Sequence, residues 1–134
     1  MLKVTKREKE GWLRKEDIDN FPCEDLRTID QLWVKYSRGK FGFSVQKHIY
    51  QSLGGTRNYD REIWEAFCDK VGWRQGGKFV VYSDLTFSLD THFMGHLPMT
   101  PHYIALSRSR FVTRGTRIED ENRRFFSRAE TCRL

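Results

Sequence analysis

The chain has 134 residues, which is enough to bury one hydrophobic core but not two, so we expect a single domain. The hydrophobic fraction is 38%, the mean hydropathy is -0.70, and no apolar run approaches the roughly 18 residues of a membrane-spanning helix, so we expect a soluble protein. The net charge of +6 favours an anionic partner, which leaves nucleic acid, a membrane surface and a carboxylate-bearing ligand open.

Residues 1–20 are polar and charged with Trp12, Leu13 and Ile18 as their only apolar anchors, so we expect an N-terminal segment that packs loosely on a domain formed by residues 21–134. This start lacks the apolar run of a secretory signal, which favours an intracellular compartment. Pro22 opens a predicted helix with acidic residues in its first turn, and Gly39 follows its end. Apolar residues at three-to-four spacing predict the buried face of this helix, namely Leu26, Ile29, Leu32, Trp33 and Tyr36.

Two further helices are predicted in the middle of the chain. Ser44 is expected to cap the first, which runs through Leu53 and buries Val45, Ile49 and Leu53. The second runs from about residue 60 to residue 70, with Gly72 as its stop and Arg61 facing Glu65. Its inward residues are predicted to be Ile63, Trp64, Phe67 and Val71.

The remaining chain predicts less regular structure before a closing helix. A turn is expected at residues 76–77, followed by a short strand or extended arm over residues 79–82. Pro98 and Pro101 favour an ordered irregular loop over residues 90–103. Residues 119–133 have the spacing of an amphipathic helix with a basic face. The sequence therefore predicts the all-α class, a single compact helical domain with long irregular aromatic loops.

Motifs for catalysis and metal binding are weak. Cys23, Cys68 and Cys132 lack the spacing of zinc or redox sites and are interpreted as free structural thiols. A metal cluster of His92, His96 and His102 is disfavoured because the nearby glycine and prolines oppose a helix, so we expect surface or loop histidines. Neither a nucleophile elbow nor a phosphate loop is present, so a conventional enzyme is unsupported.

Aromatic and arginine residues give the clearest functional pattern. Residues 107–134 hold eight arginines and no lysine against four acidic residues, and arginine suits carboxylates and phosphates. Several aromatic residues fall in predicted loops, namely Phe41, Phe43, Trp73, Phe79, Phe93 and Tyr103. Together they favour a site for a planar ring that bears carboxylates, or for single-stranded nucleic acid. A solvated basic tail with loop aromatics stapled to the core is the alternative without a ligand.

Three segments carry a resemblance to a known family: EDLRTIDQLWVKYSRGKFGFSVQKHIY at residues 24–50, GHLP at residues 95–98 and FFSRAETC at residues 125–132. With these runs the chain resembles the genomes-uncoupled-four family of tetrapyrrole-binding proteins over about residues 8–132. YDREIWEAF, VGW and YSDLTF are most similar to the cyanobacterial branch. Family domains usually begin with additional helices, and we expect this chain to start after them.

The resemblance implies an all-helical domain shaped like a cupped hand, whose irregular loops hold protoporphyrin IX or Mg-protoporphyrin IX. It implies a non-catalytic protein that stimulates magnesium chelatase through the large porphyrin-binding subunit in chlorophyll biosynthesis. It further implies a location in the cyanobacterial cytoplasm or the plastid stroma, with peripheral contact to photosynthetic membranes. We expect a monomer and no nucleic acid partner, and a chain that inserts the metal itself is remote.

Carried over by motif, the resemblance also implies the residues of the site. The ligand-facing wall would consist of Val34, Phe41, Phe43, Tyr103 and Ile104. The propionates of the porphyrin would pair with Arg124 and Arg128 on the closing helix, and Arg114 and Arg117 are second candidates.

Overall fold

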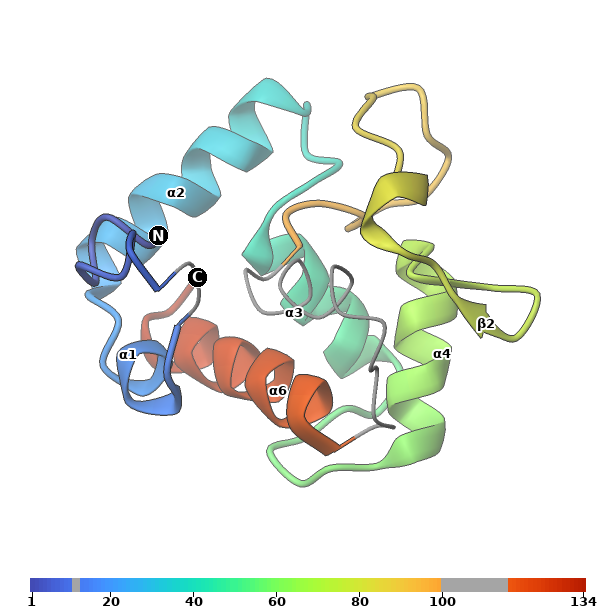
Figure 1. The fold of residues 1–134 in the computed structure, drawn as a ribbon. Coiled ribbons are helices and arrows are strands. Elements are labelled where there is room, and N and C mark those ends of the chain that lie inside the picture. Colours follow the sequence, from blue (N-terminus) through green and yellow to red (C-terminus); the bar gives the residue numbers. More distant parts are fainter. Residues whose placement is uncertain (11–12, 100–115) are drawn as a thin grey trace.

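The computed structural model describes residues 1–10, 13–99 and 116–134 (Figure 1). Its α-helices are α1 (Lys15–Asp19), α2 (Cys23–Tyr36), α3 (Phe43–Ser52), α4 (Arg61–Val71) and α6 (Thr116–Thr131). Two-residue strands, β1 (Arg74–Gln75) and β2 (Lys78–Phe79), pair antiparallel, and a short 3-10 helix, η1 (Tyr82–Asp84), follows them. The predicted all-α class is confirmed. No helix of the described residues has the length and apolar character that crossing a membrane requires.

Helix α2 forms where the sequence predicts it, directly after Pro22, but its apolar stripe is buried only in part. Leu26 is fully buried, whereas Leu32 is 50% and Tyr36 is 71% exposed. Figure 1 shows the reason, because the C-terminal half of α2 extends away from the other helices. Periodicity identifies residues that share a face, but a neighbouring element must cover that face for it to be buried.

Helix α3 begins at Phe43 after the N-cap residue Gly42, so the predicted cap at Ser44 is wrong. The cap group comes from another helix, since the Asp30 carboxylate of α2 accepts the Ser44 backbone N–H at 2.8 Å. The most buried face of α3 consists of Phe43, Gln46 and Tyr50. The predicted inward residues Val45, Ile49 and Leu53 are only half-buried, because α3 lies between neighbours and has more than one packed side.

Helix α4 confirms its predicted start and stop. The Asp60 carboxylate accepts the N–H groups of Glu62 and Ile63, and Gly72 ends the helix with a left-handed φ of 77°. The predicted pair of Arg61 and Glu65 is present, with 3.1 Å between Nε and Oε1. The predicted turn at residues 76–77 joins β1 to β2, but the strand ends at Phe79 and does not extend to residue 82.

Two apolar clusters form the core, and α6 contributes to both. One holds Tyr50, Trp64, Phe67, Cys68, Val71, Trp73, Leu85, Met99 and Phe126. The other holds Leu13, Ile18, Phe21, Leu26, Phe43, Phe125 and Cys132. Leu13 and Ile18 are each 1% exposed, so these two apolar residues anchor the N-terminal segment to the core as predicted.

A disulfide joins Cys23 at the start of α2 to Cys132 after the end of α6, with 5.1 Å between the Cα atoms. The prediction of three thiols is therefore wrong for this pair, whereas Cys68 is buried and not disulfide-bonded, as predicted. The two cysteines are 109 residues apart, and only the packing of α6 beside the start of α2 brings them together. Arg27 supports the same junction, since its Nε donates to the Cys132 carbonyl at 3.0 Å.

Candidate ligand-binding site

Two loops are hydrogen-bonded to each other beside the end of α2, and we call them the loop frame: residues 37–42 and residues 95–98. The Gly42 N–H donates to the Leu97 carbonyl at 3.0 Å, and the Gly95 N–H donates to the Lys40 carbonyl at 2.8 Å. The Lys40 ammonium also donates to the Leu89 carbonyl at 2.6 Å. These bonds fix the chain near residue 90 against the end of α2.

Buried side chains donate hydrogen bonds to the backbone of the second loop of the frame, residues 95–98. Gln46 of α3 donates from Nε2 to the carbonyls of Gly95 at 2.9 Å and Pro98 at 2.8 Å. The Trp73 indole N–H donates to the His96 carbonyl at 2.8 Å. Because these groups are buried, each loop carbonyl that lost its donor would carry a desolvation cost, so the loop is held in one conformation.

His96 is a structural residue of this frame. It lies in a loop, as the expectation of surface or loop histidines allows, and it is 1% exposed, whereas His92 is exposed. Its Nδ1 lies 2.6 Å from the Val71 carbonyl, and its Nε2 accepts the Thr86 N–H at 3.2 Å. A carbonyl can only accept, so Nδ1 carries the proton. Both ring nitrogens are thus used within the fold, which leaves neither to bind a ligand.

Gly42 allows the loop frame to approach α2 closely. A Cβ built at this position would lie 2.8 Å from Asp30 Oδ1 and 2.9 Å from Val34 Cγ2, and φ is 138°. A side chain at Gly42 would therefore displace either the loop or α2. Gly39 in the same loop also has positive φ, but a Cβ there would meet nothing within 4 Å.

Large apolar side chains are exposed on the end of α2 and on the chain from β2 to residue 94. We call this set the apolar rim: Leu32, Tyr36, Phe79, Val81, Phe87, Leu89 and Met94, which are 46–71% exposed. Figure 1 shows the end of α2 and the segment around residues 85–95 at the same end of the molecule. Large exposed apolar side chains beside a rigid loop are candidates for a binding surface.

Positive charge borders the rim. The Lys35 ammonium lies 5.8 Å from the centre of the Tyr36 ring, and Arg38 follows with an exposed side chain. Lys40 adds a third cation in the loop frame. An apolar surface edged by cations suits a flat apolar ligand with acidic substituents.

Three residues of the predicted wall are described, and they lie in or near this frame, two of them buried. Val34 is half-buried on α2. Phe41 is 2% exposed and meets Trp33 edge to face at 6.4 Å between ring centres. Phe43 is 1% exposed and stacks on Phe125 with 5.6 Å between ring centres and 2° between ring planes. Tyr103 and Ile104 lie outside the described residues.

The predicted arginines of the closing helix contact a different region. Arg124 forms an ion pair with Asp19, and Arg128 donates from Nε to the Phe21 carbonyl at 2.8 Å. Both contacts hold α6 against the junction of α1 and α2. Arg114 lies outside the described residues, as does the side chain of Arg117.

Sequence reasoning missed most of the rim. Leu32 and Tyr36 were assigned to the core because their spacing continues the stripe of α2. Phe87, Leu89 and Met94 were not predicted as site residues, although the sequence indicates that they could be exposed. They are apolar residues in a segment without helical periodicity, where no repeating face could bury all of them.

Comparison with known proteins identifies relatives of this chain. A Ycf53 protein of Porphyra purpurea is 40% identical over 89 residues, 66% of this chain and 34% of the relative. A Ycf53-like protein of Synechocystis is 34% identical over the same length, covering 66% and 35%. A chloroplastic tetrapyrrole-binding protein of Arabidopsis thaliana is 30% identical over 101 residues, covering 69% and 36%. The chain thus spans about a third of the length of the curated relatives it matches.

A solved structure and a family model agree with these relatives. The ligand-free structure of Arabidopsis thaliana GUN4 superposes with a TM-score of 0.64 at 26% identity, covering 92% of this chain and 79% of that one. The model of the GUN4-like family matches residues 1–112, which include α2, the loop frame and the rim. The chain belongs to the GUN4-like family.

Proposed function

We propose that this chain binds a porphyrin, protoporphyrin IX or Mg-protoporphyrin IX, at the apolar rim and catalyses no reaction itself. The observation that carries the proposal is the rim beside a rigid loop frame in a chain of the GUN4-like family. A relative that is 30% identical is described as tetrapyrrole-binding, which supports the same class of ligand.

The chemistry of the rim fits a flat macrocycle. A porphyrin has two broad apolar faces. Burying them against exposed leucine, phenylalanine and methionine side chains contributes a favourable binding free energy of about 25 cal/mol per Å² of apolar surface removed from water. Its two propionates are anionic and would remain at the edge, where Lys35 and Arg38 carry positive charge. The hydrogen-bonded frame supports affinity because little loop entropy is lost when the ligand binds.

The predicted wall residues take different parts in this proposal. Val34, Phe41 and Phe43 would form the packed support below the rim, and Tyr103 and Ile104 would contact the macrocycle. For the propionates, Arg114 and Arg117 are preferred to Arg124 and Arg128, because the latter two have partners at the junction of α1 and α2.

We further propose that the loaded chain stimulates magnesium chelatase through its large porphyrin-binding subunit and thereby serves chlorophyll biosynthesis. The location would be the cyanobacterial cytoplasm or the plastid stroma, with peripheral contact to photosynthetic membranes. The chain would act as a monomer. Relatives from cyanobacteria, red algae and a chloroplast support this setting.

Titration with protoporphyrin IX tests the binding proposal. We expect a red-shifted Soret band and quenched tryptophan fluorescence with a dissociation constant of about 1 μM. The double variant Leu32→Ser/Tyr36→Ser should bind about tenfold more weakly, because it removes apolar contact area from the rim. Tyr59→Ser is the matched control, since Tyr59 is 40% exposed but does not belong to the rim. Equal affinity of the double variant and the parent would contradict the proposed site.

Two further measurements separate the alternatives. A single-stranded oligonucleotide titrated at several salt concentrations should show no specific binding; tight binding that weakens steeply with salt would favour the nucleic acid function instead. In a chelatase assay, adding the chain should raise the rate of Mg-protoporphyrin formation. An unchanged rate with a chain that still binds porphyrin would refute the chelatase part of the proposal alone. Phe43→Ala is a poor test of either part, because its ring stacks on Phe125 in the core.

A further inference from the structure

A cavity lies on a different part of the molecule from the apolar rim. It has a volume of about 410 Å³ and opens between α3, the connection of residues 53–60 and α6. Figure 1 shows this connection at the end of the molecule opposite the segment around residues 85–95. The side chains and backbone that line the cavity belong to Lys47, Tyr50, Gln51, Gly55, Thr56, Arg57, Asn58, Arg123, Phe126, Ser127 and Glu130.

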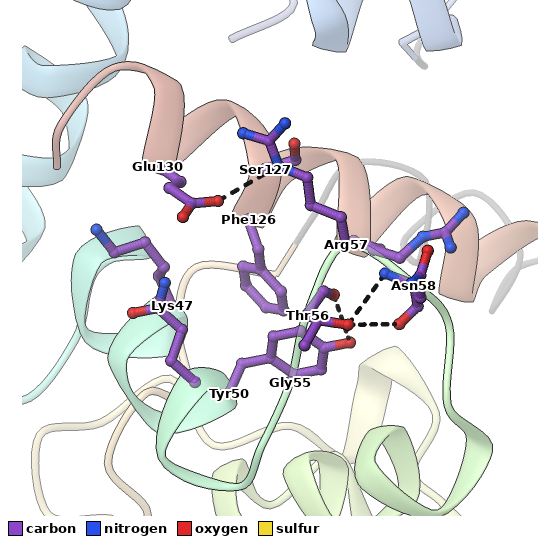
Figure 2. Close-up of a pocket in the computed structure, with 11 residues that line it drawn as sticks. Lys47, Tyr50, Gly55, Thr56, Arg57, Asn58, Phe126, Ser127 and Glu130 are labelled. Carbon is purple, nitrogen blue, oxygen red and sulfur yellow. Dashed lines mark hydrogen bonds and ion pairs between the residues drawn. The ribbon is translucent and has the colours of Figure 1, made fainter.

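Two aromatic rings form the apolar part of this cavity. The centres of the Tyr50 and Phe126 rings are 5.0 Å apart, and both side chains are anchored in the core. Figure 2 shows the two rings between α6 and the backbone of the connection, with Lys47, Arg57 and Glu130 around them. A ligand in the cavity would therefore meet ring edges on one side and polar groups on the others.

The wall beside Tyr50 is built with little freedom to move. A Cβ added at Gly55 would lie 2.4 Å from the Tyr50 ring, so only glycine allows the connection to pass there. The Gly55 N–H donates to the Tyr50 carbonyl at 2.9 Å, and the Tyr50 hydroxyl donates to the Thr56 carbonyl at 3.4 Å. The Asn58 N–H donates to the Thr56 hydroxyl at 3.2 Å, which fixes the next turn of the wall.

The charges around the cavity are mostly positive. Among the described lining residues, Lys47, Arg57 and Arg123 are cationic and Glu130 is anionic. Arg57 and Glu130 form an ion pair of 3.5 Å and are 68% and 51% exposed, so a competing anion can reach this guanidinium from solvent. Burial raises the pKa of the Tyr50 hydroxyl, the Arg123 guanidinium opposes this shift and the Asp60 carboxylate adds to it, so both charges act at the floor of the cavity.

We propose that this cavity binds a small metabolite with a ring or other apolar body and an oxyanion, either phosphate or carboxylate. The oxyanion would pair with Arg57 and with Lys47, whose ammonium also donates to the Leu134 carbonyl oxygen, and the apolar body would lie against Phe126 and Tyr50. The volume suits a ligand of the size of a nucleoside monophosphate and is in the range of known small-molecule sites. This site is separate from the rim and does not depend on porphyrin binding.

Titration followed by backbone amide chemical shifts tests this site with four probes: adenosine monophosphate, 4-hydroxybenzoate, inorganic phosphate and uncharged adenosine. We expect either of the first two to shift the amides of residues 55–58 and of Ser127 with a dissociation constant at or below about 1 mM. Adenosine should shift them much less. A response to the phosphate ester alone or to the carboxylate alone identifies the oxyanion. No shift from either, or an equal shift from adenosine, overturns the proposal.

Charge variants distinguish a site from general attraction. Arg57→Gln should weaken binding of the responding probe by about fivefold or more. Arg61→Gln is the matched control, because Arg61 also pairs with a glutamate at the surface but lies outside the cavity lining. Equal weakening by both variants would assign the effect to net charge and refute the site. Arg57→Gln should also bind protoporphyrin IX like the parent, and a loss there would instead make the cavity part of the porphyrin site.

Discussion

Buried polar side chains position the loops of this protein residue by residue. Asp30, Gln46 and His96 are 6%, 1% and 1% exposed, and each bonds a backbone group of a segment distant in sequence. A hydrogen bond of this kind contributes about 1 kcal/mol, whereas a buried backbone group left without its partner costs about 1–3 kcal/mol. The side chains therefore select one loop conformation more strongly than they stabilise the fold.

Asp17 contributes electrostatic stabilisation at the N-terminal side of the molecule. Its Oδ2 accepts the Arg14 backbone N–H and the Arg7 guanidinium, both at 2.9 Å. Burial raises the pKa of this carboxyl, but the two hydrogen bonds outweigh burial and hold the pKa below its ordinary value. A lowered pKa in the folded state means that Asp17 stabilises the fold above the unfolded-state pKa and loses this contribution as the pH falls through the folded-state pKa.

Asp17→Asn tests this contribution. We expect it to lower the free energy of unfolding by about 1 kcal/mol at pH 7, measured by urea denaturation. The difference in unfolding free energy between variant and parent should shrink below about pH 3.9. There the carboxyl of the parent becomes protonated and neutral, like the amide of the variant. Glu8→Gln, at an exposed position, is the control and should change stability little at either pH. A difference that stays constant down to pH 3 would contradict the role assigned to the carboxylate.

At the scale of elements, the docking of α6 on the start of α2 joins the two ends of the described fold. The disulfide, the bond from Arg27 and the bond from Arg128 all cross this contact. A link between residues 109 positions apart restricts the unfolded chain strongly, which is the main source of disulfide stabilisation in the chain-entropy description.

Cys132→Ser measures the contribution of this link. We expect a loss of about 2–4 kcal/mol in the free energy of unfolding under non-reducing conditions. Adding dithiothreitol to both proteins should remove most of the difference, because the parent then lacks the disulfide too. Cys23→Ser should behave like Cys132→Ser, and the double variant should lose no more than either single one. If the reductant left the stability of the parent unchanged, the disulfide would not form in solution.

The elements differ in how far local sequence predicts them. Helix α4 was predicted almost to the residue because Asp60 and Gly72 carry its cap and stop within the segment itself. Helix α3 was predicted with the wrong cap because its cap group, Asp30, comes from another helix. A helix cap can therefore be predicted from local sequence only when the capping side chain is a near neighbour in the chain of the N–H group that it accepts.

The candidate site was predicted in outline for a related reason. The resemblance directed attention to the end of α2 and the loop at residues 95–98, where the rim and the frame lie. The exposure of Leu32 and Tyr36 could not follow from spacing, since it depends on where neighbouring elements stop. The partners of Arg124 and Arg128 were also inaccessible to sequence reasoning, because they lie 105 and 107 residues away.

At the scale of the whole molecule, adjacent residues of α6 connect the two apolar clusters. Phe125 packs with Phe43 in one cluster, and Phe126 packs with Tyr50 and Phe67 in the other. Because one rigid helix supplies both rings, neither cluster can separate from α6 without disturbing the other. The clusters should therefore lose their structure together.

Denaturation followed by two probes checks this coupling. Two of the four tryptophans, Trp64 and Trp73, lie in one cluster and report on it by fluorescence, whereas far-ultraviolet circular dichroism reports on all helices. We expect coincident urea transitions by both methods, as for a two-state domain of this size. The same coincidence should hold for Phe125→Leu at a lower urea midpoint, since the variant weakens the other cluster. Separate transitions in the parent would show that the clusters unfold independently.

The covalent bridge between Cys23 and Cys132 has a consequence for the connectivity of the molecule. Every peptide bond from residue 23 to residue 132 lies inside a closed ring, so a single protease cut in the exposed connection at residues 57–60 would leave both pieces attached. Both chain ends also pack on the same cluster, through Met1, Leu2 and Leu134. A nicked chain would therefore migrate as one species in a non-reducing gel and fall into two fragments only after the sulfur–sulfur bond is reduced.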